Sequence, residues 1–298
     1  MLNQPLIVVA TDFSECSDHA IRAGEKIRSL SKGTLRIVHV ASFPFEWDWL
    51  TNDVTVNYLP PTFNKDLVQG LKKKLDQQVS SCEAKAETEI ISGSPSKVLK
   101  NYIEKEKVDL IITGHKGAGA TPEFMGSVTS KLVSTSNVPV LIVNKPLVVS
   151  KVAGLIESSQ PLEKTFSATE EMGFLFNAQI EFISVLQDIG AIGLGNLPVK
   201  TKSYTRFTPD EIVEVKKAME QCIRLYMDPH SKALVRTEVS EEGISSTLKR
   251  ILDEEAVDLA VLSRNQRNFI EKVFIGSVAR RLIETYTGNI LVLPPEAK

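Results

Sequence analysis

A glycine-rich stretch is the part of the sequence best suited to chemistry, because it follows an apolar run and precedes a helical pattern. In "GHKGAGATPEFMGS", residues 114–127, Gly114 and Gly117 follow "VDLIIT", and Gly126 and Ser127 begin a segment of helical period. A helix start carries unpaired N–H groups and a partial positive charge, so an anion there is stabilised. Glycine lets backbone approach a phosphate, and a serine hydroxyl adds a donor. The stretch predicts a phosphate cradle or, on the alternative interpretation, a turn followed by a plain helix start.

Two better-known glycine motifs are excluded. No GK[ST] occurs, so the stretch is not a P-loop, and it does not follow the dinucleotide pattern GxGxxG. A second stretch, "GAIGLGNLP" from Gly190, resembles that pattern only superficially because Pro198 stands at its last glycine position. We expect a flexible surface loop there.

The elements that position the glycines follow from hydrophobic periodicity. Short apolar runs rich in β-branched residues predict buried strands at Leu6 to Ala10, Leu35 to Val40, Leu110 to Thr113 and Val140 to Val143. Stretches of helical period between them predict helices at Ser17 to Leu30, Asp66 to Ala84, Ser96 to Lys105 and Ser127 to Ser134. In the second half, Thr208, Pro209 and Glu211 predict a helix start with a capping box. Alternating strands and helices imply right-handed crossovers and a parallel sheet covered on both faces.

In such a sheet, ligands bind beyond the carboxyl ends of the strands, where the strand order reverses. The residues to inspect are therefore Thr11 and Asp12 after the first strand, Val40 at the end of the second, and the glycine stretch. Asp12 is an acceptor that suits ribose hydroxyls, and Val40 offers an apolar surface to a base. Together with the glycines they predict a nucleotide site at one sheet edge.

The order of motifs repeats within the chain. "KVDLIITGHKG" matches "AVDLAVLSRNQ", and "FMGSVTSKLV" matches "FIGSVARRLI" in the same sequence order. We expect two similar domains, 1–147 and 148–298, joined by almost no linker.

Composition sets further bounds. The chain has 298 residues, a net charge of -2, 42% hydrophobic and 24% charged residues, so no general attraction to nucleic acid or anionic membrane is expected. The basic residues 72–74 lie between apolar residues of helical spacing, so we expect them to cover the solvent-exposed face of an amphipathic helix. The 3 cysteines are widely spaced, which favours reduced thiols over a disulfide framework or a zinc site. The N-terminal sequence has neither a signal pattern nor a membrane span, so we expect a cytoplasmic protein without a membrane partner.

The whole set of motifs resembles the universal stress protein family in its tandem form. The resemblance rests on "VVATDFSECSDHAI", "IVHV", "SGSP" and the ordered glycines, and it covers both halves. It implies two Rossmann-like, adenine nucleotide alpha hydrolase-like domains, each an α/β unit with five parallel strands, paired through their last strands as a pseudo-dimer. It also implies a site for ATP, with or without Mg²⁺. The residues carried over to that site, with Thr11 beside them, are Asp12 at the ribose, Val40 at the adenine, Thr113 and Gly114 at the adenosine edge, and Gly117, Gly126, Ser127 and Val128 at the phosphates.

The first half departs from the family pattern in its loop. ATP-binding members usually have nine residues between the last two glycines of the motif, whereas residues 118–125 are eight. The loop carries Pro122 and Glu123 where basic residues are common, although His115 and Lys116 could supply positive charge.

The second half departs further. Alignment puts Ser263 and Gln266 in place of the two cradle glycines, Glu157 in place of Asp12 and Ser184 in place of His39, while Gly276 and Ser277 are retained. We expect a degenerate, empty second site. Arg264 and Arg267 could bind a smaller anion, but we expect solvated surface charge.

Two questions stay open at this point. The connection after the second strand gathers aromatic residues, and it is either a lid or protein-binding patch or a segment packed on its own domain; these residues are Phe43, Phe45, Trp47, Trp49, Tyr58 and Phe63. No catalytic pairing of carboxylates, Ser/His/Asp or Cys/His can be argued, so we expect no dedicated enzyme and at most slow ATP hydrolysis.

The leading hypothesis is a stress-response or signalling protein that binds adenine nucleotide in its first domain. The alternative is a scaffold of the same fold that acts through protein contacts; further association into a homodimer is left open.

Overall fold

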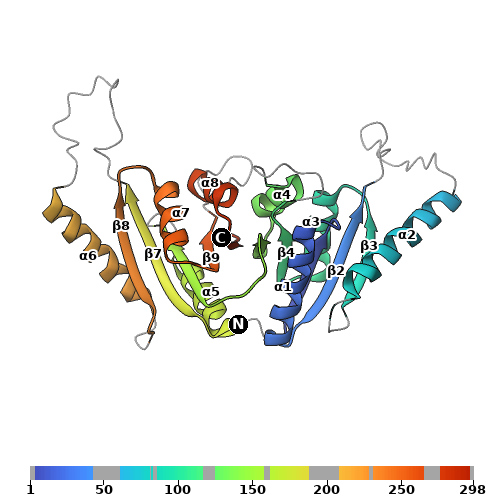
Figure 1. Ribbon diagram of the computed structural model, residues 1–298, viewed down its shortest axis with the longest axis horizontal. Coiled ribbons are helices and arrows are strands. Elements are labelled where there is room, and N and C mark those ends of the chain that lie inside the picture. The colour runs from blue at the N-terminus through green and yellow to red at the C-terminus, as the bar shows by residue number, and fades with distance from the viewer. Residues whose placement is uncertain are drawn as a thin grey trace, which may run out of the picture. The chain divides into compact units, whose positions relative to one another are not determined.

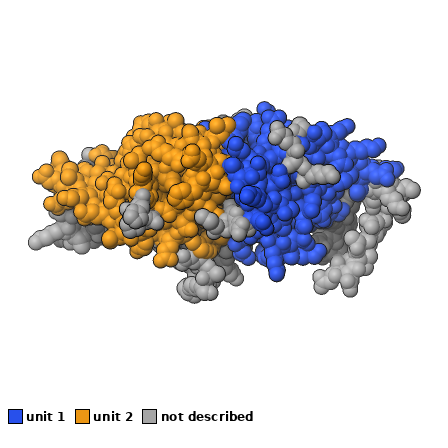
Figure 2. All heavy atoms as spheres, turned by 90° about the horizontal axis from the view of Figure 1, so that it is seen from below, with its two compact units in different colours: residues 1–147 blue, residues 148–298 orange. Residues whose placement is uncertain are grey.

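The computed structural model describes residues 4–42, 61–80, 82, 86–116, 125–157, 162–187, 208–227, 231–264 and 276–295 (Figure 1). The chain divides into two compact units, residues 1–147 and 148–298, which Figure 2 colours separately. Among the described helices, none is both long and apolar enough to cross a membrane.

The first unit is a parallel sheet whose strands alternate with helices. Its elements are β1 (Leu6–Thr11), α1 (Glu15–Ser31), β2 (Thr34–Ala41), α2 (Pro61–Val79), β3 (Glu87–Ser92), α3 (Pro95–Glu106), β4 (Leu110–Gly114), α4 (Ser127–Thr135) and β5 (Val140–Val143). The strand order is β3-β2-β1-β4-β5, and every described pairing is parallel. The order therefore reverses at β1, between β2 and β4.

The second unit repeats this plan. Its elements are β6 (Lys151–Ile156), α5 (Glu163–Phe176), β7 (Gln179–Gln187), α6 (Pro209–Tyr226), β8 (Leu234–Ser240), α7 (Ile244–Glu254), β9 (Leu259–Ser263), α8 (Ser277–Thr285) and β10 (Asn289–Leu293). The strand order β8-β7-β6-β9-β10 matches that of the first unit, again with parallel pairings. The predicted α/β fold with five parallel strands in each half is confirmed. The pairing of the halves through their last strands stays a prediction.

The strand sequences explain why helices cover both faces of each sheet. Strands β4 and β5 are buried along their whole length, and Ile7, Ile37 and Ile112 are fully excluded from solvent. Side chains alternate between the faces of a sheet, so a continuously apolar strand must be covered on both sides. Right-handed crossovers put α1 and α2 on one face and α3 and α4 on the other, and α3 packs against α4.

The predicted helix over residues 66–84 is wrong at both ends, because α2 spans Pro61–Val79. Proline suits the first turn of a helix, where its missing N–H costs nothing. At the other end, a turn closes the helix, with the Cys82 N–H donating to the Val79 carbonyl at 2.9 Å. The capping box is confirmed: the Thr208 hydroxyl accepts from the Glu211 N–H, and the Glu211 carboxylate accepts from the Thr208 N–H at 2.7 Å.

Strand β3 was missing from the strands named from the sequence. It lies at the edge of the sheet, and none of its residues is fully buried. Its sequence "ETEIIS" therefore lacks the continuous apolar run that marks the central strands.

Candidate functional site

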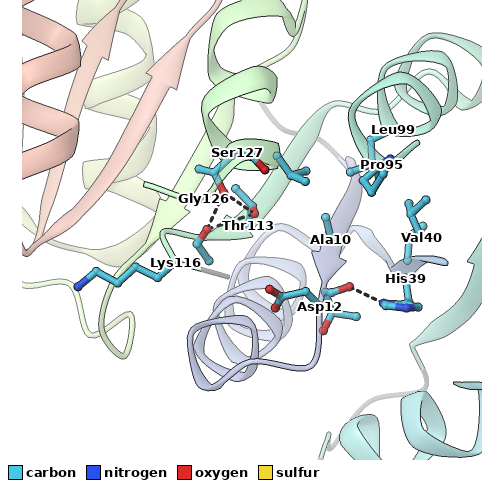
Figure 3. Close-up of a pocket in the computed structure, with 15 residues that line it drawn as sticks. Ala10, Asp12, His39, Val40, Pro95, Leu99, Thr113, Lys116, Gly126 and Ser127 are labelled. Atoms are coloured by element: carbon cyan, nitrogen blue, oxygen red, sulfur yellow. Dashed lines mark hydrogen bonds between the residues drawn. The ribbon is translucent and has the colours of Figure 1, made fainter. Parts of the chain in front are cut away.

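A cavity of about 400 Å³ opens at the carboxyl edge of the first sheet (Figure 3). Its walls come from the ends of β1, β2 and β4 and from the starts of α3 and α4. This is the point at which the strand order reverses, where α/β sheets leave a crevice. Eight predicted site residues line it: Thr11, Asp12, Val40, Thr113, Gly114, Gly126, Ser127 and Val128. The ninth, Gly117, lies outside the described residues.

The start of helix α4 forms one wall of the cavity. Gly126 is its N-cap and offers no side-chain hydrogen bond to the first turn. The Gly126 N–H donates to the His115 carbonyl at 2.9 Å, which ties the two ends of the intervening loop together. The positive end of a helix dipole thus lies on the cavity wall, where it stabilises negative charge.

Buried hydroxyls fix this helix start to the end of β4. The Thr129 hydroxyl donates to the Gly114 carbonyl at 2.8 Å and lies 3.2 Å from the Thr113 hydroxyl (Figure 3). Both threonines are buried, with exposed fractions of 4% and 6%. The cavity wall is therefore held by hydrogen bonds between α4 and β4.

Gly114 is required by close packing. A Cβ at this position would lie 2.8 Å from the Cys16 Cβ and 2.9 Å from the Cys16 carbonyl carbon. Any larger residue must push the start of α1 away from the strand. The glycine identified in the sequence serves helix packing as well as the cavity.

Asp12 belongs to a tight turn between β1 and α1. Its carboxylate accepts from the Ser14 N–H at 3.1 Å, and Figure 3 shows Asp12 at the edge of the cavity. The next residue, Phe13, has a φ of 65°, in the left-handed region that costs energy for a residue other than glycine. Surrounding contacts must hold this turn in place.

His39 also lines the cavity, although the sequence reasoning did not include it in the site. Its Nδ1 lies 2.8 Å from the Thr11 carbonyl, and a carbonyl only accepts, so Nδ1 carries the hydrogen. Burial lowers the pKa of His39 below 6.5 and favours the neutral ring. The ring centroids of His39 and Phe13 are 4.3 Å apart.

Of the two adjacent cations considered from the sequence, Lys116 lines the cavity and His115 does not. His115 is only 3% exposed, and its N–H donates to the Val143 carbonyl at 3.1 Å. Of the two sources of positive charge considered from the sequence, His115 is therefore not placed at the cavity. The hydrogen bonding to β5 continues one residue past the end of β4, and the side chain of His115 is therefore buried in the protein.

Several wall residues were missed from the sequence: Ala10, Val38, His39, Pro95, Leu99 and Thr129. Pro95 and Leu99 lie in the first turns of α3, directly after β3. The motif "SGSP" was the available signal, since it marks a helix start behind a strand, but β3 had not been recognised.

Parts of the expected site lie outside the described residues. They include Pro122 and Glu123 of the glycine loop and the aromatic residues 43–58 of the connection after β2. Phe63 lies in α2, and its side chain is also outside the description. Among the described residues, no group of three or more His, Cys, Asp or Glu could hold a metal ion.

The second unit has different residues at the corresponding edge. Thr11 pairs with His39 in the first sheet and Ile156 with Ser184 in the second, so Ile156 replaces Thr11. Ser263, which replaces Gly114, has its hydroxyl 2.7 Å from that of Thr165.

Arg264 corrects a sequence-based expectation. Its side chain is 4% exposed, and burial lowers its pKa to about 10, so it is not solvated surface charge. It directly follows β9, as His115 follows β4, and the same strand register buries both side chains. Gln266 and Arg267 lie outside the described residues.

Comparison with known proteins identifies relatives of the first half. Residues 6–144 match the Universal stress protein family. A universal stress protein of Methanocaldococcus jannaschii is 29% identical over 148 residues, which is 47% of this chain and 82% of the relative. One from Bacillus subtilis is 29% identical over 146 residues, 46% of this chain and 97% of the relative.

Over its first half, the chain is similar to the universal stress protein family.

The fold of both units is also that of a solved universal stress protein. The crystal structure of one from Archaeoglobus fulgidus superposes with a TM-score of 0.68 and covers 98% of each chain at 15% identity. In this chain, therefore, the same α/β plan occurs twice, and the described cavity lies in the half that matches the family.

Proposed function

We propose that the chain is a tandem universal stress protein whose first domain binds one adenine nucleotide, ATP, and that it acts in stress response or signalling in the cytoplasm rather than as a dedicated enzyme. The observation that carries the proposal is the convergence of eight predicted residues on a single cavity at the switch point of the sheet. Its volume of about 400 Å³ falls within the usual range for small-molecule sites.

The cavity offers a different chemistry to each part of the nucleotide. Val40 and Leu99 supply apolar surface for the base, and Asp12 supplies acceptors for ribose hydroxyls. The start of α4, with Ser127 and Val128, faces the phosphates, where Lys116 adds positive charge. Among the described lining residues, only Asp12 carries a carboxylate, so Mg²⁺ would be held mainly by phosphate and water.

We propose that the second domain holds no nucleotide. An isoleucine, Ile156, replaces the hydroxyl of Thr11, and Ser263 adds a side chain where the first domain has Gly114. The second edge therefore lacks the Thr11 hydroxyl and the glycine at the end of the fourth strand, two of the residues assigned to the nucleotide in the first domain.

ATP titration by calorimetry tests the proposal. The wild type is expected to bind ATP with a stoichiometry near one per chain. Gly126→Val should abolish binding, because the added side chain occupies the cavity wall at the start of α4. The matched substitution in the second domain, Gly276→Val at the N-cap of α8, should leave binding unchanged. Absence of heat with ATP in large excess would overturn the proposal, and equal loss in both variants would overturn the single-site assignment.

A scaffold of the same fold that binds no nucleotide is the second candidate. It is favoured by large apolar side chains exposed on the second unit, namely Phe174 at 73%, Leu225 at 84% and Tyr226 at 50%. If the wild type binds no ATP, these residues become the first targets for substitution in a search for protein partners.

A further inference from the structure

The Gln78 side chain joins helix α2 to Thr11 in the cavity wall. The Thr11 hydroxyl donates to Gln78 Oε1 at 2.9 Å, and Gln78 Nε2 donates to Asp18 Oδ1 at 2.6 Å and to Ser17 Oγ at 3.3 Å. Thr11 lines the cavity, whereas Ser17 and Asp18 lie in the first turn of α1. Gln78 therefore joins α2, the end of β1 and the start of α1.

The proton count fixes the direction of the Gln78 bonds, whereas the single proton of the Thr11 hydroxyl is shared between Gln78 Oε1 and Ser17 Oγ, which lies 3.0 Å away. Asp18 can only accept, so the amide nitrogen of Gln78 must face it and the amide oxygen must face Thr11. The Ser17 hydroxyl donates to the Ser14 carbonyl at 2.7 Å and can accept from Gln78. The Thr11 oxygen accepts in turn from the Phe13 N–H at 3.1 Å. Removing the Gln78 amide leaves Ser17 Oγ as the remaining side-chain acceptor of the Thr11 hydroxyl, which must then turn toward α1, and leaves Asp18 without this donor.

The same bonds hold the turn that carries Asp12. Phe13 has its left-handed φ of 65° while its N–H is bound to the Thr11 hydroxyl, which has Gln78 Oε1 as one of two acceptors for its own proton. Asp12 lies between these two residues. A change in the direction of the Thr11 hydroxyl would therefore release the strained turn and move the carboxylate at the cavity edge.

The second unit shows that the fold does not need this network. The strand register aligns Gly154 with Val9. Gly154 lies against Thr169 of α5, as Val9 lies against Gly24 of α1, so Thr169 corresponds to Gly24. Counting back the same number of residues from each, Leu162 corresponds to Ser17. Ile156, in place of Thr11, joins an apolar cluster with Leu162. Helix α6, the counterpart of α2, contributes Ile223 to this cluster, and its C-cap residue Met227 also belongs to it. The first unit, which has the cavity, has the hydrogen-bonded polar side chains at this corner.

We propose that Gln78 is a positioning residue of the nucleotide site, which acts through Thr11 to hold the Asp12 turn and to couple helix α2 to the bound ligand. The inference rests on the proposed binding of ATP. Burying polar groups is costly unless they are fully paired, and the second unit packs the same corner with apolar side chains. The polar network in the first unit is thus explained by the site and not by the fold.

The experiment compares ATP affinity and melting temperature among matched variants. Gln78→Leu, which imitates the apolar packing of the second unit, should weaken ATP binding by about tenfold. The matched control is Gln77→Leu, because Gln77 is an exposed neighbour on the same helix outside the network. It should bind ATP like the wild type. Without ATP, both variants should melt within a few degrees of each other, since the fold tolerates apolar residues at this corner.

A double-mutant cycle shows whether Gln78 acts through Thr11. Thr11→Val and Gln78→Leu should each weaken ATP binding, and the double variant should be no weaker than the worse single one. Gln78→Glu alone should also bind weakly, because it sets two carboxylates side by side with Asp18. Adding Asp18→Asn restores a donor and an acceptor and should recover affinity, which a merely structural role would not require.

The possible outcomes separate this inference from the proposed function. If the wild type binds no ATP, both fail. If the wild type binds ATP and Gln78→Leu binds equally well, or if the losses in the cycle add in full, only the role of Gln78 is overturned.

Discussion

At the scale of single residues, His39 makes the stability of the first unit depend on pH. Its Nδ1 donates to the Thr11 carbonyl at 2.8 Å, and burial lowers its pKa below the ordinary value of 6.5. In the unfolded chain the ring regains its ordinary pKa, so between the two values the unfolded chain binds more protons than the folded chain. The stabilisation from the neutral ring is complete above pH 6.5 and is lost as the pH falls below it.

We therefore expect the free energy of unfolding of the first unit to fall from about pH 7.5 to about pH 5.5. His39→Asn keeps a donor for the Thr11 carbonyl but cannot titrate, so its curve should be flatter. Urea unfolding across this range measures both proteins. Parallel curves would show that other groups cause the pH dependence.

At the scale of elements, the buried hydroxyl of Thr129 attaches the start of α4 to the sheet. Thr129 donates to the Gly114 carbonyl at 2.8 Å and so connects the helix that faces the phosphates to the strand beneath it. Removing this donor leaves the buried Gly114 carbonyl with the longer, 3.3 Å bond from the Thr113 hydroxyl, and a poorly satisfied buried acceptor lowers stability.

Thr129→Val should lower the free energy of unfolding by about 1 to 3 kcal/mol and weaken ATP binding, because the helix start loses its attachment. The matched control on the same helix is Thr135→Val, whose exposed hydroxyl donates to the Lys131 carbonyl. That variant should change the free energy of unfolding by less than about 0.5 kcal/mol. Chemical denaturation and calorimetry measure the two effects, and equal losses in both variants would contradict the special role of Thr129.

At the scale of the whole molecule, two units of one fold carry different residues at the same sheet edge. The first has hydroxyls at Thr11 and Ser17, and the second has an apolar cluster around Ile156 and Phe166. The units have therefore diverged at the edge where ligands bind while keeping one strand order. Pairing of the units as a pseudo-dimer stays a prediction.

ATP should accordingly stabilise one unit only. At a free concentration of about 100 times Kd, ATP should add about 2.7 kcal/mol to the free energy of unfolding of the unit that binds it. Hydrogen exchange followed by mass spectrometry should show slower exchange in peptides from residues 1–147, above all at the starts of α1 and α4. Comparable protection in residues 148–298 would contradict a single functional site.

How far the sequence predicts the fold depends on how each segment is buried. Strands β4 and β5 are central and apolar throughout, so their sequences alone reveal them. Edge strand β3 is half polar and was missed, and with it the contributions of Pro95 and Leu99 to the cavity. Helix α2 was displaced by five residues at both ends because its polar surface gives a weak periodic signal.

The sequence by itself determined the α/β class, the internal repeat and the residues at the strand ends. Side-chain periodicity is a local property that reveals strands and helices. The order of these elements then implies a parallel sheet, whose ligands bind beyond the carboxyl ends of the strands. Only the tertiary structure decided which side chains meet at the cavity. It brought Gln78 to Thr11, 67 residues away, and buried His115 and Arg264 behind their strands. Such contacts depend on the register and packing of distant elements, and no local pattern encodes them.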